Sequence, residues 1–179
     1  MNAPVPDEVI LGLLAAHPQH GYELLERFRS RAHLGRIWTM STSQLYAVLK
    51  RLEREGLIEG QQLQSPDAPP RTEYAVTEAG LQRLHVWLNE PRPSSSIRRI
   101  RVEFLSRLYI ASLLDISPAS IVERQKSICL EQHERLLRDR QQAASEVEAL
   151  TLDLVLGQLE AALVWLERCK EGLPSVGKS

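Results

Sequence analysis

The sequence has few aromatic residues and almost no net charge. Only 5% of its 179 residues are Phe, Trp or Tyr, and the basic and acidic residues nearly cancel to a formal net charge of −1. A chain without an overall positive charge gives no global indication of a nucleic-acid partner. The scarcity of aromatic residues, beside abundant Leu, Arg, Glu, Gln and Ala, favours helices. The composition therefore predicts a mainly helical protein.

Cysteine is also scarce, and long apolar runs are lacking. Cys129 and Cys169 are far apart in the sequence, which predicts free thiols in a reducing compartment rather than a disulfide framework. No apolar run approaches the roughly 20 residues that span a bilayer. The N-terminus lacks the basic and apolar segments of a secretory signal. We therefore expect a cytoplasmic protein with no membrane partner.

Motifs of catalysis and of metal binding are missing too. The chain has no Gly-rich phosphate loop, no cluster of metal ligands and no nucleophile–base pattern. His17 and His20 have no acidic or cysteine cluster near them in the sequence, and Cys129 with His133 is more simply a packed thiol beside a surface histidine. The sequence predicts no catalytic residue, no metal and no cofactor. An enzyme is therefore the least favoured class.

The most informative stretch that is present is residues 41–60. Leucines and a valine recur there at helical spacing and predict one buried stripe. Ser41 or Thr42 can cap the first turn, and Gly56 suits a left-handed C-terminal cap. The predicted outer face carries Ser43, Gln44, Tyr46, Ala47, Lys50, Arg51 and Arg54.

Positive charge gathers around this stretch. Residues 27–54 hold seven Lys and Arg side chains and a single Glu, in a chain that is otherwise slightly acidic. A half-buried helix with such an outer face can lie in the major groove of DNA. The alternative is the solvated face of an ordinary amphipathic helix.

The segments around this helix predict a small α+β domain. Two helical patterns precede it, and alternating residues at 57–63 and 71–77 predict the two strands of a hairpin, followed by a further helix. The proline-rich segment 64–70 predicts an extended loop at the hairpin tip. This order suits a winged helix-turn-helix, which places its third helix in the major groove and its hairpin beside the phosphate backbone. The alternative is a packing unit that reads no groove.

The second half of the chain is predicted to be entirely helical. Residues 91–96 are rich in proline and serine and predict a linker. Three helical patterns follow it, so we predict a winged-helix DNA-binding domain at residues 1–91 and a three-helix dimerisation domain at residues 92–179. Together these predictions give a mainly α fold.

The last helix, expected at about residues 150–171, carries the stripe from which we predict dimerisation. Long helices with broad apolar faces are most simply covered by pairing with a second copy, although a monomeric antiparallel bundle is the alternative. The residues of this stripe, at alternating spacings of three and four, are Leu152, Leu156, Leu159, Leu163 and Leu166.

Several segments in this order resemble the PadR-type winged-helix transcriptional regulators. Residues 10–14 and 20–24 are similar to the family's opening helix and turn, residues 42–58 to its recognition helix, and residues 71–80 to its second wing strand and the next helix. The helical second half is similar to the dimerisation domain of longer members. The resemblance implies a homodimeric repressor that binds an imperfect palindrome in double-stranded DNA and, in some members, a small-molecule effector.

The chain departs from the family pattern in the third helix and in the wing. Ser43 and Gln44 stand where the family usually has glycine and threonine, and Ala47 stands where proline is frequent. The wing also carries fewer basic residues than is usual. These departures concern the DNA sequence that is bound and leave the expected fold unchanged.

On this hypothesis the polar residues have separate roles. The amide of Gln44 suits adenine in the major groove, whereas hydroxyls at the helix start and the cations suit phosphates. An adaptor that binds protein through its winged-helix fold is the alternative function. The expected DNA-binding residues are Thr42, Ser43, Gln44, Tyr46, Lys50, Arg51 and Arg71, with Tyr22 and His20 as secondary phosphate contacts.

Overall fold

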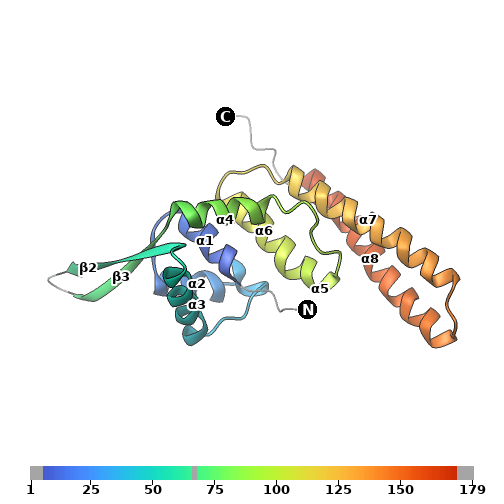
Figure 1. Cartoon of the computed structure of the whole chain (residues 1–179), viewed down its shortest axis with the longest axis horizontal. Coiled ribbons are helices and arrows are strands. Elements are labelled where there is room, and N and C mark those ends of the chain that lie inside the picture. Colours follow the sequence, from blue (N-terminus) through green and yellow to red (C-terminus); the bar gives the residue numbers. More distant parts are fainter. Residues whose placement is uncertain (1–5, 66–67, 173–179) are drawn as a thin grey trace. The chain divides into compact units, whose positions relative to one another are not determined.

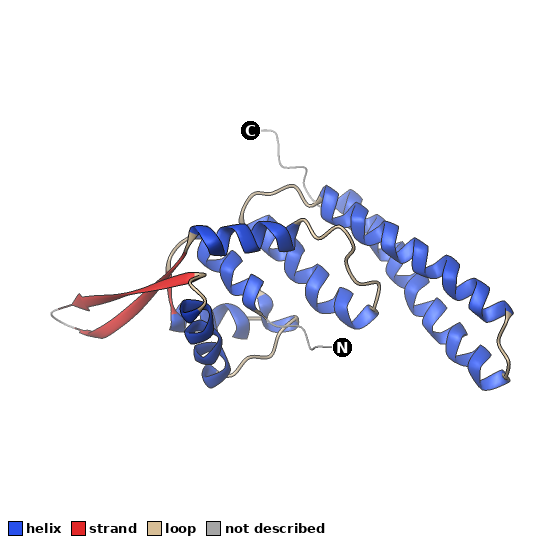
Figure 2. Cartoon of the chain, in the orientation of Figure 1, coloured by secondary structure: helices blue, strands red, loops and turns tan. Residues whose placement is uncertain are grey.

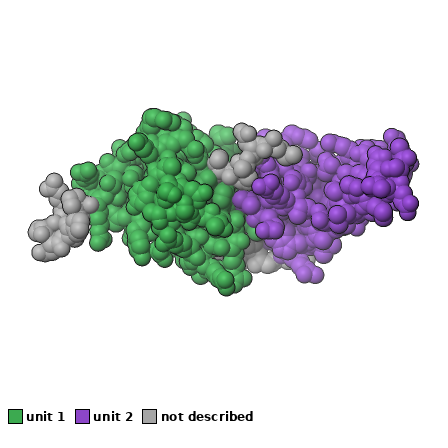
Figure 3. Space-filling model, turned by 90° about the horizontal axis from the view of Figure 1, so that it is seen from below, with its two compact units in different colours: residues 1–89, 105–116 green, residues 90–104, 117–179 purple. Residues whose placement is uncertain are grey.

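The computed structural model describes residues 6–65 and 68–172, which form a mainly helical chain with one small antiparallel sheet (Figures 1 and 2). This confirms the predicted fold class. The chain divides into two compact units (Figure 3). The first unit is Met1–Asn89 with Leu105–Ile116, and the second is Glu90–Phe104 with Ser117–Ser179.

The core of the first unit is built from helices whose apolar faces meet. Leu13 on the first helix, Leu24 on the second and Leu45 and Leu49 on the third are fully buried. This leucine pattern follows the helical spacing that the sequence predicted. The helices of this unit are α1 (Asp7–Ala16), α2 (Gly21–Arg29), α3 (Thr42–Arg54), α4 (Glu78–Leu88) and α6 (Leu105–Leu113), with a 3₁₀ turn η1 (Leu34–Arg36) before α3.

The sheet of the first unit has three antiparallel strands in the order β1 (Gln19–His20), β3 (Ala68–Val76) and β2 (Ile58–Ser65). β2 and β3 form the hairpin that projects from the helices in Figure 1. β1 was not predicted, because its two residues are too few to show an alternating pattern in the sequence.

The hairpin strands extend further than the sequence predicted. We expected an open loop over residues 64–70, but β2 continues to Ser65 and β3 begins at Ala68, and only residues 66–67 of that loop lie outside the described residues. The pairing shifts between Leu63 and Ser65, opposite Pro69 and Pro70. Proline has no N–H to donate within a sheet. Pro69 and Pro70 are tolerated here because they lie at a bulge, in a part of β3 that does not pair with β1.

α6 belongs to the first unit, although it follows the linker in sequence. A Cβ atom on Gly12 of α1 would lie 2.5 Å from Ile110 of α6, so the two helices pack in close contact. Arg107 is buried, donates to the Trp87 carbonyl at 2.9 Å and stacks 5.1 Å from the centre of its ring. The compact units therefore differ from the predicted linear division at residue 91, because this helix buries its apolar and aromatic contacts against α1 and α4.

The second unit is a set of helices centred on a long antiparallel pair. α7 and α8 are joined by ion pairs at seven-residue intervals, Lys126 with Glu167, His133 with Glu160 at 3.0 Å and Arg140 with Asp153 at 2.6 Å. Cys129 is a buried free thiol, as the sequence favoured, and His133 pairs with Glu160 of α8. The helical elements are α5 (Ile97–Arg99), the π-helical turn η2 (Ile100–Phe104), α7 (Ala119–Gln141) and α8 (Glu146–Gly172).

α8 carries apolar residues on two opposite sides. One side is the predicted leucine stripe, and its members Leu156, Leu159 and Leu166 are buried within the single chain. The other side we name the outer stripe; its large residues are exposed, with Leu154 at 64%. The outer stripe consists of Val147, Leu150, Leu154, Gly157, Ala161 and Val164.

This two-sided composition corrects one prediction from the sequence. We expected no segment apolar enough to span a membrane, but Glu146–Cys169 is long and apolar enough by length and composition, since it contains an 18-residue window with a mean hydropathy of 1.5. A helix of a soluble protein can pass the same test. Here the segment also contains Asp153 and Glu160, whose carboxylates form ion pairs with α7.

Candidate nucleic-acid interface

The start of α3 is fixed by its own side chains. Ser41 is the N-cap: its hydroxyl accepts from the Gln44 amide N–H at 3.2 Å, and the Gln44 side-chain oxygen accepts from the Ser41 N–H at 2.9 Å. This reciprocal capping box satisfies two amides of the first turn. The oxygen of Gln44 is therefore engaged with the backbone, and its NH₂ group remains to face a partner. The spacing Ser41-x-x-Gln44 is a capping-box signature that the sequence analysis did not use.

Hydroxyls surround this first turn. Thr42 and Ser43 are exposed; the Thr42 hydroxyl accepts from Arg29 Nη2 at 3.2 Å, and the Ser43 hydroxyl lies 3.1 Å from that of Ser41. Arg29 thus brings a cation from α2 to the N-terminus of α3, a contact that the sequence did not predict. About two turns further along, Lys50 is exposed on the outer face of the helix. This face can present amide, hydroxyl and ammonium donors to an anionic partner.

A second group of predicted residues lines a hollow between α2, α3 and β3. The hollow has a volume of about 750 Å³, and we name it the tyrosine hollow. It brings together four residues predicted separately from the sequence, His20, Tyr22, Tyr46 and Arg71. Its lining residues are His20, Gly21, Tyr22, Glu23, Tyr46, Arg71, Thr72 and Tyr74.

Close packing and hydrogen bonds hold the walls of this hollow. A Cβ atom on Gly21 would lie 2.8 Å from the Tyr46 hydroxyl, so a glycine at the start of α2 lets α3 approach. The ring Nδ1 of His20 lies 3.2 Å from the Thr72 carbonyl oxygen, and its backbone N–H donates to Glu23 at 2.8 Å. Tyr22 remains 66% exposed at the rim. The hollow therefore offers a phenol, an imidazole and a guanidinium beside the outer face of α3.

Tyr74 is a lining residue that the sequence analysis missed. Burial, with smaller contributions from Glu53 and Tyr46, raises the pKa of the Tyr74 hydroxyl above its ordinary value of 10.0. The hydroxyl is therefore a neutral donor at physiological pH. Thr72 and Tyr74 alternate along β3, and that period-two pattern was the available signal that both face the same side of the strand.

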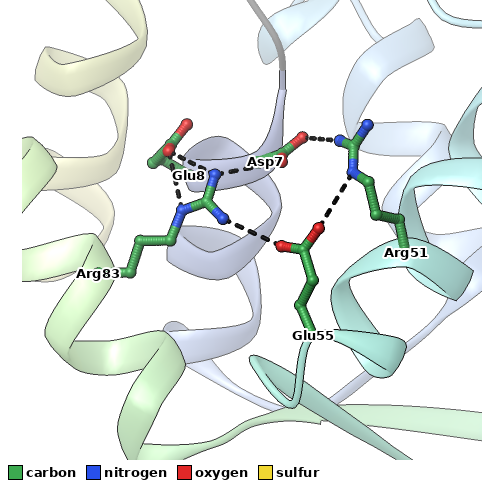
Figure 4. Close-up of polar contacts among 5 residues, drawn as sticks. All are labelled: Asp7, Glu8, Arg51, Glu55 and Arg83. Atoms are coloured by element: carbon green, nitrogen blue, oxygen red, sulfur yellow. Dashed lines mark hydrogen bonds and ion pairs between the residues drawn. The ribbon is translucent and has the colours of Figure 1, made fainter.

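Arg51 does not share the exposed face with Lys50. Its guanidinium donates to the buried carboxylate of Asp7 on α1, and its Nε lies 4.0 Å from Glu55 (Figure 4). Arg83 of α4 completes the network with Asp7 at 3.2 Å and Glu55 at 3.3 Å. Arg51, which we predicted to contact a phosphate, thus forms internal ion pairs in this structure, and helical spacing alone does not reveal them.

Burial and neighbouring charges shift the pKa values of Asp7 and Arg83 in this network. Burial, together with Glu8, raises the pKa of Asp7 above its ordinary value of 3.8, although Arg51 and Arg83 act to lower it. Burial alone would lower the pKa of Arg83, but Glu8, Asp7 and Glu55 outweigh it and raise the value. The guanidinium of Arg83 therefore remains charged beside the carboxylates that it contacts.

Residues 10–86 match the family described as Transcriptional regulator PadR-like family. Among curated proteins, the Negative transcriptional regulator PadR of Bacillus subtilis is 33% identical over 113 residues, which cover 62% of this chain and 59% of that protein. A probable transcriptional regulator of Mycobacterium tuberculosis is 29% identical over 181 residues, covering 92% of this chain and 95% of that protein. These relatives are regulators and not enzymes.

A solved structure of Bacillus subtilis PadR in complex with operator DNA is also similar to this chain. It shares 25% sequence identity and a TM-score of 0.48, covering 94% of this chain and 98% of that one. A TM-score below 0.5 does not show that the whole chains share one arrangement.

Proposed function

Residues 10–86 of this chain are a domain of the PadR-like transcriptional regulator family, and from that premise we propose that the protein binds operator DNA as a homodimeric repressor. The observation that carries the proposal is the two-sided character of α3. Its leucines are fully buried, while Thr42, Ser43 and Lys50 are exposed beside the tyrosine hollow. A helix held in this way can enter the major groove with its polar face toward the bases.

Some residues of the interface would contact phosphates and position the protein on DNA, and others would contact bases and recognise the sequence. The N-terminus of α3, with the Thr42 and Ser43 hydroxyls, suits one phosphate, because free amides and hydroxyls donate there. Lys50 and Arg71 are exposed cations for neighbouring phosphates. The NH₂ group of Gln44 can donate to an acceptor on a base edge, whereas the bidentate contact with adenine requires the capping box to open.

Gel-shift titrations over a salt series test this division. We expect Lys50→Ala to weaken binding to all duplexes alike and to lower the slope of log affinity against log salt by about 0.9, the loss of one phosphate contact. Gln44→Ala should change the preferred sequence and leave the slope intact. Equal loss of selectivity in both variants would contradict the role of Gln44. Absence of any salt-dependent binding by the unchanged protein would favour the alternative of a protein-binding adaptor.

The outer stripe of α8 supports the proposed homodimer. Its residues alternate at spacings of three and four, from Val147 through Leu154 to Val164, which is the heptad pattern of paired helices. Gly157 has no other atom within 4 Å of a Cβ built upon it, and Ala161 is also small, so a second helix can approach closely at this point. A second copy presents the same stripe and would cover it by two-fold symmetry.

This assignment moves the predicted dimer contact to the opposite side of α8. Leu156, Leu159 and Leu166 are already buried inside one chain, so they support dimerisation by fixing α8 in place rather than by touching the partner. A two-fold dimer would set its recognition helices roughly 34–36 Å apart, to match successive turns of a palindrome. The expected operator is an imperfect palindrome.

We further propose a small effector and a cytoplasmic location. The second unit has a hollow of about 500 Å³, in the range of small-molecule sites, with Arg98, Gln132 and Gln158 as polar groups and Leu136 and Leu159 as apolar ones. A thermal-shift screen of small molecules tests this site, with Arg98→Gln as the comparison variant. A compound that stabilises both proteins equally would place the effector elsewhere.

A further inference from the structure

Asp7 is a buried carboxylate at the first residue of α1, with 4% of its surface exposed. Its Oδ1 accepts a hydrogen bond from Nη2 of Arg51 on α3, and its Oδ2 accepts one from Nη2 of Arg83 on α4 at 3.2 Å (Figure 4). A buried charge is costly unless it is paired and hydrogen-bonded. The position of this carboxylate and the positions of the two guanidinium groups therefore depend on one another.

The contacts around Asp7 close into a ring that reaches α3 twice. Glu55, the C-cap of α3, lies 3.3 Å from Nη1 of Arg83 and 4.0 Å from Nε of Arg51. Glu8 adds contacts of 3.1 and 2.9 Å to Arg83. The last turn of α3 is thus tied to α1 and α4, while the capping box of Ser41 and Gln44 fixes its first turn.

The guanidinium of Arg51 is used within this ring. It contacts two carboxylates, Asp7 and Glu55, and its side chain is 36% exposed. A phosphate would have to compete with both carboxylates for it. Lys50, the neighbouring residue of α3, is exposed and has no such partner among the described residues. Two adjacent cations of one helix therefore have different surroundings.

We propose that Asp7 and Arg51 are positioning residues, which set the rotation of α3 and do not themselves contact DNA. This inference rests on the DNA-binding function proposed above. A base contact fails when its donor leaves a hydrogen-bond range of a few tenths of an ångström, whereas attraction to phosphates acts over longer distances. Loss of the ring therefore reduces binding to the preferred sequence more than binding to unrelated DNA.

The test compares two duplexes of equal length over a salt series, one selected from a random pool by the unchanged protein and one unrelated. For Asp7→Asn and Arg51→Gln we expect the ratio of specific to unrelated affinity to fall by about tenfold, the size of one lost base contact. The salt slope should stay as it is. The double variant should be no worse than either single variant, because both changes break one interaction.

Three further variants separate positioning from other roles. Arg51→Lys keeps the charge and loses the planar fork, so we expect a lower specificity ratio at an unchanged salt slope. Lys50→Ala should instead lower the slope and leave the ratio intact. Asp153→Asn makes the same chemical change at an exposed ion pair with Arg140 and should alter neither quantity. Circular dichroism shows whether each variant is folded. If Asp7→Asn is unfolded, the specificity ratio of Arg51→Lys tests the inference instead.

Two results would overturn the inference. A salt slope lowered by about 0.9 in Arg51→Gln, with effects that add to those of Asp7→Asn, would make Arg51 a phosphate contact. An unchanged specificity ratio in folded Asp7→Asn and Arg51→Lys would show that the ring only stabilises the fold. If the unchanged protein shows no salt-dependent binding to any duplex, the proposed function fails first, and the role of Asp7 in DNA binding fails with it.

Discussion

The two units bury their apolar surface to different degrees. In the first unit, Ile10, Leu13 and Leu49 are fully buried, and even the buried Asp7 has charged partners. In the second unit, α8 covers its leucine stripe within the chain but leaves Leu150 and Leu154 more than 60% exposed. The first unit thus buries the leucines of α1, α2 and α3, while the second retains a long exposed apolar side on α8. In the function that we propose, this difference separates a surface for DNA from a surface for a second copy.

The largest effect should follow from placing a charge in the outer stripe. We expect Leu154→Glu to weaken the proposed homodimer at least about 100-fold, because each copy would bury an unpaired carboxylate in the apolar seam. Sedimentation equilibrium measures this change. Val155→Glu is the matched control, since Val155 is also exposed on α8 but lies outside the stripe. Equal weakening by both variants would contradict the assignment of the stripe.

A smaller effect should distinguish the close packing of the first unit from the open surface of the second. Gly12→Ala places a Cβ atom 2.5 Å from Ile110, and we expect a loss of about 1–3 kcal/mol of unfolding free energy from overpacking. Inside one chain, a Cβ atom on Gly157 meets nothing within 4 Å. In the Leu154→Glu background, which removes the proposed partner helix, Gly157→Ala should therefore raise the unfolding free energy by up to about 1 kcal/mol through helix propensity.

Urea denaturation at one fixed protein concentration measures both changes. Adding Ile110→Val to Gly12→Ala should recover part of the loss, because it removes one methyl group from the contact. Changes of the same sign for the two alanine variants would break the contrast between the two units.

The smallest expected effect is on the pH dependence of the unfolding free energy. Asp7 in the first unit and Asp153 in the second should contribute to it with opposite signs. The hydrogen bond from Arg140 lowers the pKa of Asp153 below 3.8, so its contribution to stability is present above that value and is lost as pH falls through the folded pKa. The pKa of Asp7 is raised, mainly by burial. The contribution of Asp7 to the unfolding free energy is therefore present below pH 3.8 and is lost as pH rises through the folded pKa.

Unfolding free energies between pH 3 and 6 measure both terms, by comparison of the unchanged protein with Asp7→Asn and with Asp153→Asn. The unfolding free energy of the unchanged protein minus that of Asp7→Asn should fall as pH rises. The corresponding difference for Asp153→Asn should grow. Parallel pH dependences would contradict the opposite environments of the two carboxylates.

Most helices were predictable because their signals are local. Ser41 caps α3 and Gly56 ends it with a φ of 69°, both as the residue types indicated. Contacts between distant segments were not predictable in this way. Nothing in the spacing of Arg51 reveals that Asp7 lies beside it, and β1 has only two residues.

The candidate site was predictable in part for the same reason. Helical spacing placed Lys50 and Gln44 on the outer face, but it did not show that the Gln44 oxygen closes a capping box. The stripe of α8 with the more regular leucines was predicted as the dimer contact, although it packs inside the chain. A pattern of apolar residues shows that a face is covered, and only the folded chain shows what covers it.

Selection of bound duplexes from a random DNA pool tests the central claim most directly. A homodimer that reads DNA through α3 should enrich one sequence with two-fold symmetry, whose half-sites lie about 10–10.5 base pairs apart from centre to centre, or a multiple of that spacing. Leu154→Glu should lose this enrichment while the protein keeps its helical circular dichroism. Enrichment of a single half-site would contradict the dimer, and a pool that shows no enrichment would contradict sequence-specific DNA binding itself.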